Sequence, residues 1–183
     1  MKRAALTALL ATALVAPSIA DACSRAVYFG LEGQTVTGRT MDWFEADLGS
    51  NMWLAPRGLE RNSNTATPVV WTSKYGSVVT TLYDGATADG MNEKGLVANL
   101  LYLGESDFGP APADDRPRLS FAAWVDYVLT NFATVNEVVD AFTDPSIYIV
   151  PINFGPGGAA HPTVHLSVTD ASGDSAIIEY LDG

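Results

Sequence analysis

Residues 23–43 read CSRAVYFGLEGQTVTGRTMDW and begin with the only cysteine among the 183 residues. Ser24–Phe29 and Thr35–Thr40 are short runs that contain β-branched and aromatic residues, and the turn-forming segment Gly30–Gly33 separates them. Two such runs on either side of a short glycine-containing turn are typical of a hairpin. We therefore predict a β-hairpin whose first strand starts directly after Cys23.

The segment before this hairpin has the pattern of a secretory signal peptide. Residues 1–22 read MKRAALTALLATALVAPSIADA, with a positively charged start, an apolar middle and a small-x-small cleavage site at residues 20–22. We expect this segment to be removed and the protein to be periplasmic or secreted. Residues 23–183 then form the mature domain, and Cys23 becomes its first residue.

Three roles are open for Cys23 on these observations alone. A free N-terminal cysteine carries a thiol and an α-amine, whose reference pKa of about 7.7–8.0 suits a base for that thiol. A lone cysteine is also commonly a small buried hydrophobe. In a lipoprotein it would be acylated, although Ala20 stands where that pattern wants a Leu-like residue. Catalytic, structural and lipidated cysteine therefore remain as alternatives at this point.

The composition limits the function classes. Residues 23–183 are enough for one domain with a substantial core. Without Lys2, Arg3 and Asp21, the chain keeps 8 basic and 20 acidic residues, which give a formal charge of −12 and argue against nucleic acid and anionic membranes. No later apolar run is long enough to span a bilayer, so stable membrane insertion is not expected. One cysteine and two histidines predict neither an internal disulfide nor a zinc site.

Most of the remaining chain has strand periodicity. We predict strands at Val69–Ser73, Ser77–Tyr83, Leu96–Leu101, Thr163–Thr169 and Ala176–Tyr180, a short apolar run at Asn51–Leu54 and an extended segment at Ile147–Ile152. Residues 60–68 are predicted as a loop, Asp89–Gly95 as a turn, and the proline-containing residues 104–118 as a loop.

Two helices are predicted between the strands. One spans Leu119–Phe132, and the second opens at the capping-box sequence of Thr134–Glu137, runs to Phe142 and is ended by Pro145. Strands, then helices, then strands without a repeated βαβ unit indicate an antiparallel-rich α+β fold.

The opening stretch also resembles a known family. Residues 23–25 (CSR) and 38–43 (GRTMDW) are similar to the start of the choloylglycine hydrolases, a family of N-terminal-nucleophile hydrolases that contains bile salt hydrolases and penicillin V acylases. The similarity continues through residues 54–58 (LAPRG) and 90–96 (GMNEKGL), and it covers essentially all of residues 23–183. The resemblance implies a four-layer αββα sandwich.

The resemblance assigns roles to individual residues. It implies that Cys23 is the nucleophile, with Arg39 and Asp42 as catalytic neighbours. We expect Met41, Trp43 and Tyr102 to contact substrate; Tyr102 stands where penicillin V acylases carry tyrosine and bile salt hydrolases asparagine. Side chains alternate along a strand, so Arg39 and Asp42 can serve one site only if the strand ends or bulges near Met41.

The implied protein is an exported amidase that cleaves a non-peptide linear amide through an acyl-enzyme. Penicillin V, an acyl-homoserine lactone or a conjugated bile salt is the expected small-molecule partner, without metal or organic cofactor; homo-oligomerisation is left open. The alternatives are a lipid-anchored, non-catalytic domain acylated at Cys23 and a glutamine amidotransferase, which an export signal disfavours. The sequence ends on Asp-Gly, a hairpin signal. We therefore expect an incomplete domain, with a catalytic asparagine and an arginine of the family beyond Gly183.

The first testable prediction concerns processing. The α-amine of Cys23 exists only after the peptide bond to Ala22 is broken, so Ala22→Pro should block cleavage and abolish turnover. Activity is measured on protein whose N-terminus is verified by mass spectrometry. Full activity in the unprocessed protein would contradict self-activation by the amine.

Overall fold

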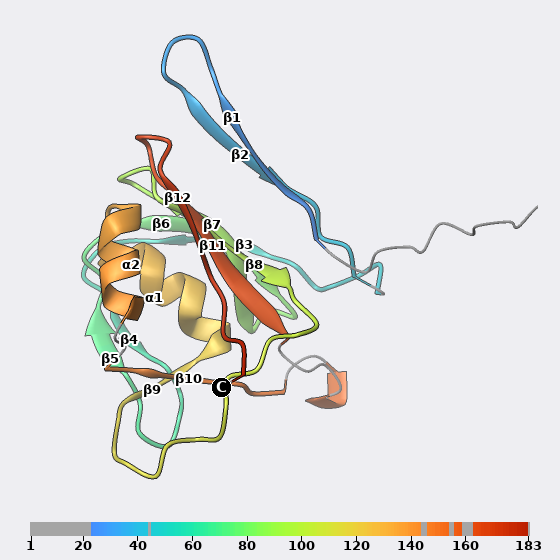
Figure 1. Cartoon of the computed structure of the whole chain (residues 1–183), viewed down its shortest axis with the longest axis vertical. Helices are drawn as coiled ribbons and strands as arrows, with labels where there is room; N and C mark the ends of the chain where they lie inside the picture. Colours follow the sequence, from blue (N-terminus) through green and yellow to red (C-terminus); the bar gives the residue numbers. More distant parts are fainter. Residues whose placement is uncertain (1–22, 44, 144–145, 154–155, 159–162, 183) are drawn as a thin grey trace, which may run out of the picture.

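The centre of the protein is a six-stranded antiparallel sheet (Figure 1). The computed structural model describes residues 23–43, 45–143, 146–153, 156–158 and 163–182. In spatial order, the sheet contains β12 (Ser175–Ile178), β11 (Val164–Thr169), β8 (Val97–Tyr102), β7 (Ala86–Asn92), β6 (Ser77–Leu82) and β3 (Met52–Ala55). Because β6, β7 and β8 are neighbours in both sequence and space, they form a meander.

Two helices cover one face of this sheet, and the core lies between the two layers (Figure 1). Helix α1 (Trp124–Asn131) lies against β6, β7 and β8, and α2 (Val135–Thr143) lies against β12. The core includes Val79, Ala98, Leu100, Leu166 and Val168 from the sheet, and Trp124, Val125, Val128, Leu129 and Val138 from the helices. Burial of these side chains holds the helical layer on the sheet.

The start of α2 is fixed by side chains on both sides of it. The backbone N–H of Glu137 donates to Thr134 Oγ1 at 3.3 Å, as the capping-box sequence predicts. The backbone N–H of Val135 donates to the carboxylate of Asp170 at 2.9 Å. Burial raises the pKa of Asp170, but hydrogen bonds from Ser172 and from the backbone outweigh it and leave the pKa below its usual value. An ionised carboxylate is favourable at a helix N-terminus.

Smaller elements surround this body. A hairpin of β1 (Arg25–Phe29) and β2 (Thr35–Arg39) projects beyond the sheet (Figure 1), with Arg25 directly opposite Arg39. Strand β4 (Glu60–Asn62) pairs with β5 (Val70–Thr72), and β9 (Arg118–Ser120) pairs in parallel with β10 (Tyr148–Val150). Two 3-10 turns, η1 (Phe121–Ala123) and η2 (Pro156–Gly158), complete the described elements.

The sheet face opposite the helices is more exposed. Leu54, Val78 and Met91 are cross-strand neighbours there, with exposed fractions of 80%, 41% and 54%. Asp89 and Asn99, another cross-strand pair, lie on the same face one row further along. Side chains from the β1–β2 hairpin reach this row, so the hairpin is attached to the open face rather than to the helical layer.

The predicted α+β class is confirmed, and a strand forms at each predicted strand position with its ends moved by at most two residues. The second helix also forms where predicted. Of the four layers implied by the resemblance, the described residues show a helical layer packed on a six-stranded sheet. The predicted helix stop at Pro145 and the histidine His161 lie outside the described residues.

Three predicted boundaries are wrong. Residues 60–68 were expected to form a loop but include β4, because its backbone pairs with β5. The expected turn at Asp89–Gly95 is shorter, since β7 continues to Asn92 through pairing with β6 and β8. The helix expected from Leu119 starts at Trp124: Leu119 and Ser120 pair instead with β10, and Ser120 Oγ accepts the N–H of Ala122. In each case the pairing with another strand overrides the pattern of the segment itself.

The packing of α1 on β7 gives the second testable prediction. A Cβ placed on Gly90 would lie 2.6 Å from Leu129 Cδ1 and 2.7 Å from the backbone oxygen of Val78. Gly90→Ala should therefore lower the free energy of unfolding by about 1–3 kcal/mol in urea denaturation. Gly38→Ala is the matched control, because a Cβ there meets no atom within 4 Å. Equal stability of the two variants would contradict the close approach of helix and strand.

Candidate active site

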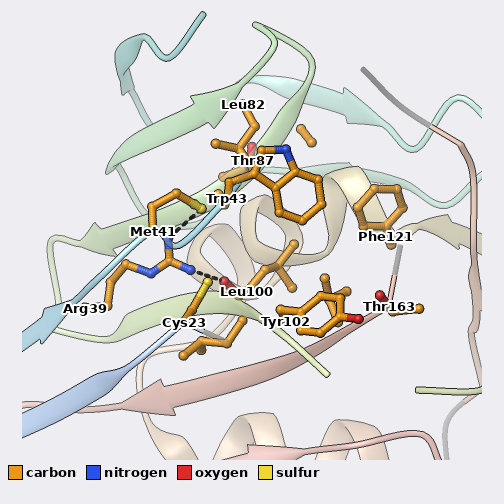
Figure 2. Close-up of a pocket in the computed structure, with 14 residues that line it drawn as sticks. Cys23, Arg39, Met41, Trp43, Leu82, Thr87, Leu100, Tyr102, Phe121 and Thr163 are labelled. Carbon is orange, nitrogen blue, oxygen red and sulfur yellow. Dashed lines mark hydrogen bonds between the residues drawn. The ribbon is translucent and has the colours of Figure 1, made fainter. Parts of the chain in front are cut away.

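A pocket lies where the β1–β2 hairpin meets the ends of β7 and β8 (Figure 2). Its lining is mostly apolar and consists of Cys23, Arg39, Met41, Trp43, Leu82, Ala86, Thr87, Ala88, Leu100, Leu101, Tyr102, Phe121, Thr163 and Val164. These residues come from segments up to 141 positions apart in sequence, so the pocket exists only in the folded chain. A mostly apolar pocket with a few polar groups is the usual form of a small-molecule site.

The hairpin positions Cys23 at this pocket. Cys23 directly precedes β1, and its half-buried side chain lies at the pocket with the sulfur directed toward the guanidinium of Arg39 (Figure 2). The backbone of Ser24 is held on both sides by Thr40: Ser24 N–H donates to Thr40 Oγ1 at 3.0 Å, and Thr40 N–H donates to Ser24 O at 2.9 Å. The cysteine backbone is therefore fixed by the end of the second strand.

Arg39 is the buried cation of the pocket. Its side chain is 9% exposed and forms an ion pair with Asp89 at 3.3 Å. The guanidinium also donates to the backbone oxygen of Leu100 and contacts Met41 Sδ at 3.3 Å. These contacts come from β7, from β8 and from the segment after β2, so the guanidinium is held on several sides.

Asp42 takes a different position from the one expected. Strand β2 ends at Arg39, so the strict alternation of side chains does not continue to Asp42. The exposed Asp42 carboxylate accepts a hydrogen bond from Thr40 Oγ1 at 2.8 Å, and the same hydroxyl accepts the N–H of Ser24. Asp42 is therefore linked to the start of β1 through Thr40, and it does not line the pocket among the described residues.

A polar cluster lies next to the pocket on the open sheet face. Arg25 donates to Asn99 Oδ1 at 2.7 Å and to Thr169 Oγ1 at 2.8 Å, and Asn99 donates to Asp89 Oδ1 at 2.7 Å. Burial raises the pKa of Asp89 above its usual value, and this effect exceeds the opposing influence of Arg39, Asn99 and Arg25. Burial likewise lowers the pKa of Arg25, although Asp89 opposes this shift. The cluster therefore places one carboxylate between two arginines in a partly desolvated position.

Aromatic rings line other sides of the pocket. Figure 2 shows Trp43, Tyr102 and Phe121 on different sides of the space near Cys23. Trp43 Nε1 donates to the hydroxyl of Tyr83 at 3.0 Å, and this hydroxyl in turn contacts the Glu45 carboxylate. The Trp43 ring is thus fixed by a hydrogen bond outside the apolar wall that it helps to form.

The structure brings together five of the six residues that the sequence proposed: Cys23, Arg39, Met41, Trp43 and Tyr102 line one pocket, and Asp42 lies beside it. Sequence analysis missed Phe121, which it placed on a helix face, and Asp89, which it placed in a turn. The glycines and the asparagine of residues 89–95 are typical of a turn, and the sequence carries no separate signal that β7 extends to Asn92 through its pairing with β6 and β8.

Two other features, a metal site and a membrane-spanning helix, were sought in the part of the chain that the structure describes. It contains no group of three or more His, Cys, Asp or Glu side chains arranged to hold a metal ion. None of its helices has the length and apolar character needed to cross a membrane.

Comparisons with known proteins place this arrangement in context. The family model of linear amide C–N hydrolases, choloylglycine hydrolase family, matches residues 23–183. Penicillin V acylase of Pectobacterium atrosepticum is 43% identical over 91% of this chain and 46% of its own length. Bile salt hydrolase/transferase of Clostridium perfringens is 30% identical over 81% of this chain and 45% of its own length.

Solved structures agree with these sequences. The penicillin V acylase of Agrobacterium tumefaciens matches with a TM-score of 0.77 and 49% identity, covering 87% of this chain and 47% of that one. A conjugated bile acid hydrolase of Clostridium perfringens, at 24% identity and a TM-score of 0.72, shows the shared fold. The chain spans about half the length of the relatives that it matches.

Proposed function

The chain belongs to the choloylglycine hydrolase family of linear amide C–N hydrolases, and from this we propose that its protein is an exported amidase with Cys23 as the nucleophile. One observation carries the proposal: Cys23 lies at a mostly apolar pocket that also contains the buried guanidinium of Arg39. A cysteine next to a cation, with partial exposure, is the environment that favours a reactive thiolate.

The reaction is proposed to pass through an acyl-enzyme. Removal of residues 1–22 frees the α-amine of Cys23, which takes the thiol proton, directly or through a water molecule. The sulfur attacks the amide carbonyl, the C–N bond of the resulting tetrahedral intermediate breaks, and the amine leaves with that proton. Water then attacks the thioester, so that the acid is released and the thiol is restored. Backbone N–H groups at the pocket would stabilise the oxyanion.

The neighbouring charges have separate tasks in this proposal. Arg39 favours the thiolate through its positive charge. Asp42 orients the N-terminus, because its bond to Thr40 restrains the same hydroxyl that accepts the N–H of Ser24. We also propose that the Asp42 carboxylate contacts the α-amine of Cys23. This amine exists only after residues 1–22 are removed, because in the uncleaved chain the same nitrogen belongs to a peptide bond.

The pocket wall suggests the acyl side of the substrate. Trp43, Tyr102, Phe121 and Met41 offer aromatic and polarizable surface, which suits an aromatic or fatty acyl group. We propose an amide of the penicillin V type as the first substrate to test, since penicillin V acylases are the more similar relatives. Conjugated bile salts and acyl-homoserine lactones are the second and third substrate classes to test. A lipid-anchored domain is the alternative from another class, and the mass of the mature N-terminus distinguishes a free cysteine from a diacylglyceryl adduct.

The nucleophile is tested by two substitutions. Cys23→Ala removes the attacking atom, and Cys23→Ser replaces the thiol with a weaker acid and poorer nucleophile, so both should bind substrate without forming an acyl-enzyme. Acyl-enzyme is measured by mass spectrometry after rapid quenching, and turnover by release of the acid. Turnover of Cys23→Ala at the wild-type rate would show that Cys23 is structural or lipidated.

The apolar wall is tested with a pair of tryptophans. Trp43→Leu removes an aromatic face from the pocket and should raise KM for an aromatic acyl amide about tenfold, equivalent to about 1.4 kcal/mol. Trp53→Leu is the control, because Trp53 is half exposed, donates to Asp84 and lies outside this pocket. Unchanged KM in Trp43→Leu, or the same increase in both variants, would contradict acyl binding at this wall.

A further inference from the structure

Two arginines of the β1–β2 hairpin converge on one carboxylate of the central sheet. Arg25 and Arg39 are direct cross-strand partners, a placement in which like charges repel. Arg39 forms an ion pair with Asp89 at 3.3 Å. Asn99 donates to the same carboxylate at 2.7 Å and accepts from Arg25. Asp89 is therefore the counter-ion that allows both cations to approach the sheet.

The backbone of β7 places Asp89 at this position. Thr80 pairs with Asp89, whereas the next residue of β6, Thr81, pairs with Thr87, so Ala88 is an extra residue in the ladder. Such a bulge redirects the side chains around it and is frequent next to active sites. Thr87 and Ala88 line the pocket, and Asp89 follows them on the open face beneath the hairpin. The same irregularity thus shapes the pocket wall and directs Asp89 toward Arg39.

We propose that Asp89 is a positioning residue, which holds the Arg39 guanidinium at the side of the pocket that contains the Cys23 sulfur. This rests on the proposed function in one respect, since it takes Cys23 as the nucleophile that Arg39 assists. Asp89 itself does not line the pocket. It acts through Arg39, whose other anchors are the backbone oxygen of Leu100 and the soft sulfur of Met41. Among the described residues, Asp89 is the carboxylate that forms an ion pair with this guanidinium.

Several charged or titratable groups surround Arg39 and Cys23. They are Arg25 on β1, Asp42 after β2, Asp89 on β7, Tyr102 at the end of β8 and His165 on β11, in register with Leu101. Burial lowers the pKa of His165, which Glu179 partly opposes. An experiment on Asp89 must therefore separate movement of Arg39 from a simple change of charge near the sulfur.

The direction in which the pH midpoint of Cys23 alkylation shifts distinguishes these two effects. Cys23 reacts with iodoacetamide as its thiolate, and peptide mapping assigns the adduct to this cysteine in the full-length processed protein. Asp89→Asn keeps the side-chain size but removes the negative charge. If Arg39 stayed in place, loss of a nearby anion would move the alkylation midpoint to lower pH. If Arg39 loses its position, the sulfur loses a cation, and the midpoint should rise by about one pH unit.

Turnover gives a second readout. A rise of one pH unit lowers the thiolate fraction near neutral pH up to about tenfold, so kcat should fall by about that factor while KM changes little. Asp126→Asn is the matched control, because Asp126 is also mostly buried and lies 3.6 Å from an arginine, Arg61, outside this pocket. It should leave the alkylation midpoint and kcat at the wild-type values.

The result decides the proposal in every case. A higher midpoint in Asp89→Asn but not in Asp126→Asn supports it, and an unchanged or lower midpoint overturns it. If circular dichroism shows that Asp89→Asn does not fold, Asn99→Ser decides instead. It removes the amide that donates to Asp89 and accepts from Arg25 while keeping the Asp89 charge, and it should raise the midpoint less. Alkylation needs no turnover, so absence of amidase activity in the wild type would refute the proposed function and still leave the positioning of Arg39 tested.

Discussion

The attachment of the β1–β2 hairpin to the open face of the sheet is the interaction on which the site depends. Cys23 precedes β1 and Arg39 ends β2, so both reach the pocket only if the hairpin is docked. Docking relies on polar contacts: Arg25 with Asn99 and Thr169, and Arg39 with Asp89 and Leu100. The desolvation of buried charges offsets much of their mutual attraction, but removal of one partner leaves the other charge uncompensated. A site assembled through such contacts therefore depends on each partner.

The two faces of the sheet have different tasks. The helical face supplies the packed core, with Trp124, Val128 and Leu129 fully buried against the strands. The opposite face carries the polar row of Asp89 and Asn99 beside exposed apolar residues such as Leu54 and Met91. The β-bulge at Ala88 interrupts the ladder of β6 and β7 at the point where β7 begins to line the pocket. The packed core and the polar row thus lie on opposite faces of a single sheet, and the pocket lies at the ends of its central strands β7 and β8.

Much of this arrangement could be predicted from the sequence because the relevant signals are local. The turn-forming segment Gly30–Gly33 between two short strand-forming runs indicates the hairpin, and the Thr134–Glu137 capping box indicates the start of α2. The residues that line the pocket from the first 43 positions were found because they share one motif. The other residues of the site carried no comparable signal. Phe121 follows β9, whose partner β10 lies about 30 residues later. Asp89 stands in a segment with the glycines and asparagine of a turn, and only the ladder with β6 and β8 shows that β7 continues to Asn92.

The span of the hairpin contacts along the chain also affects how the protein folds. Asn99 and Asp89 are 10 residues apart, whereas Arg25 and Thr169 are 144 residues apart. Loop-closure entropy makes the longer contact costlier by about 2 kcal/mol. The β6–β7–β8 meander can therefore form from local contacts, while the hairpin has to wait for a surface that includes β11. We therefore infer that Cys23 and Arg39, which the hairpin carries, reach the pocket after the β6–β7–β8 meander has formed.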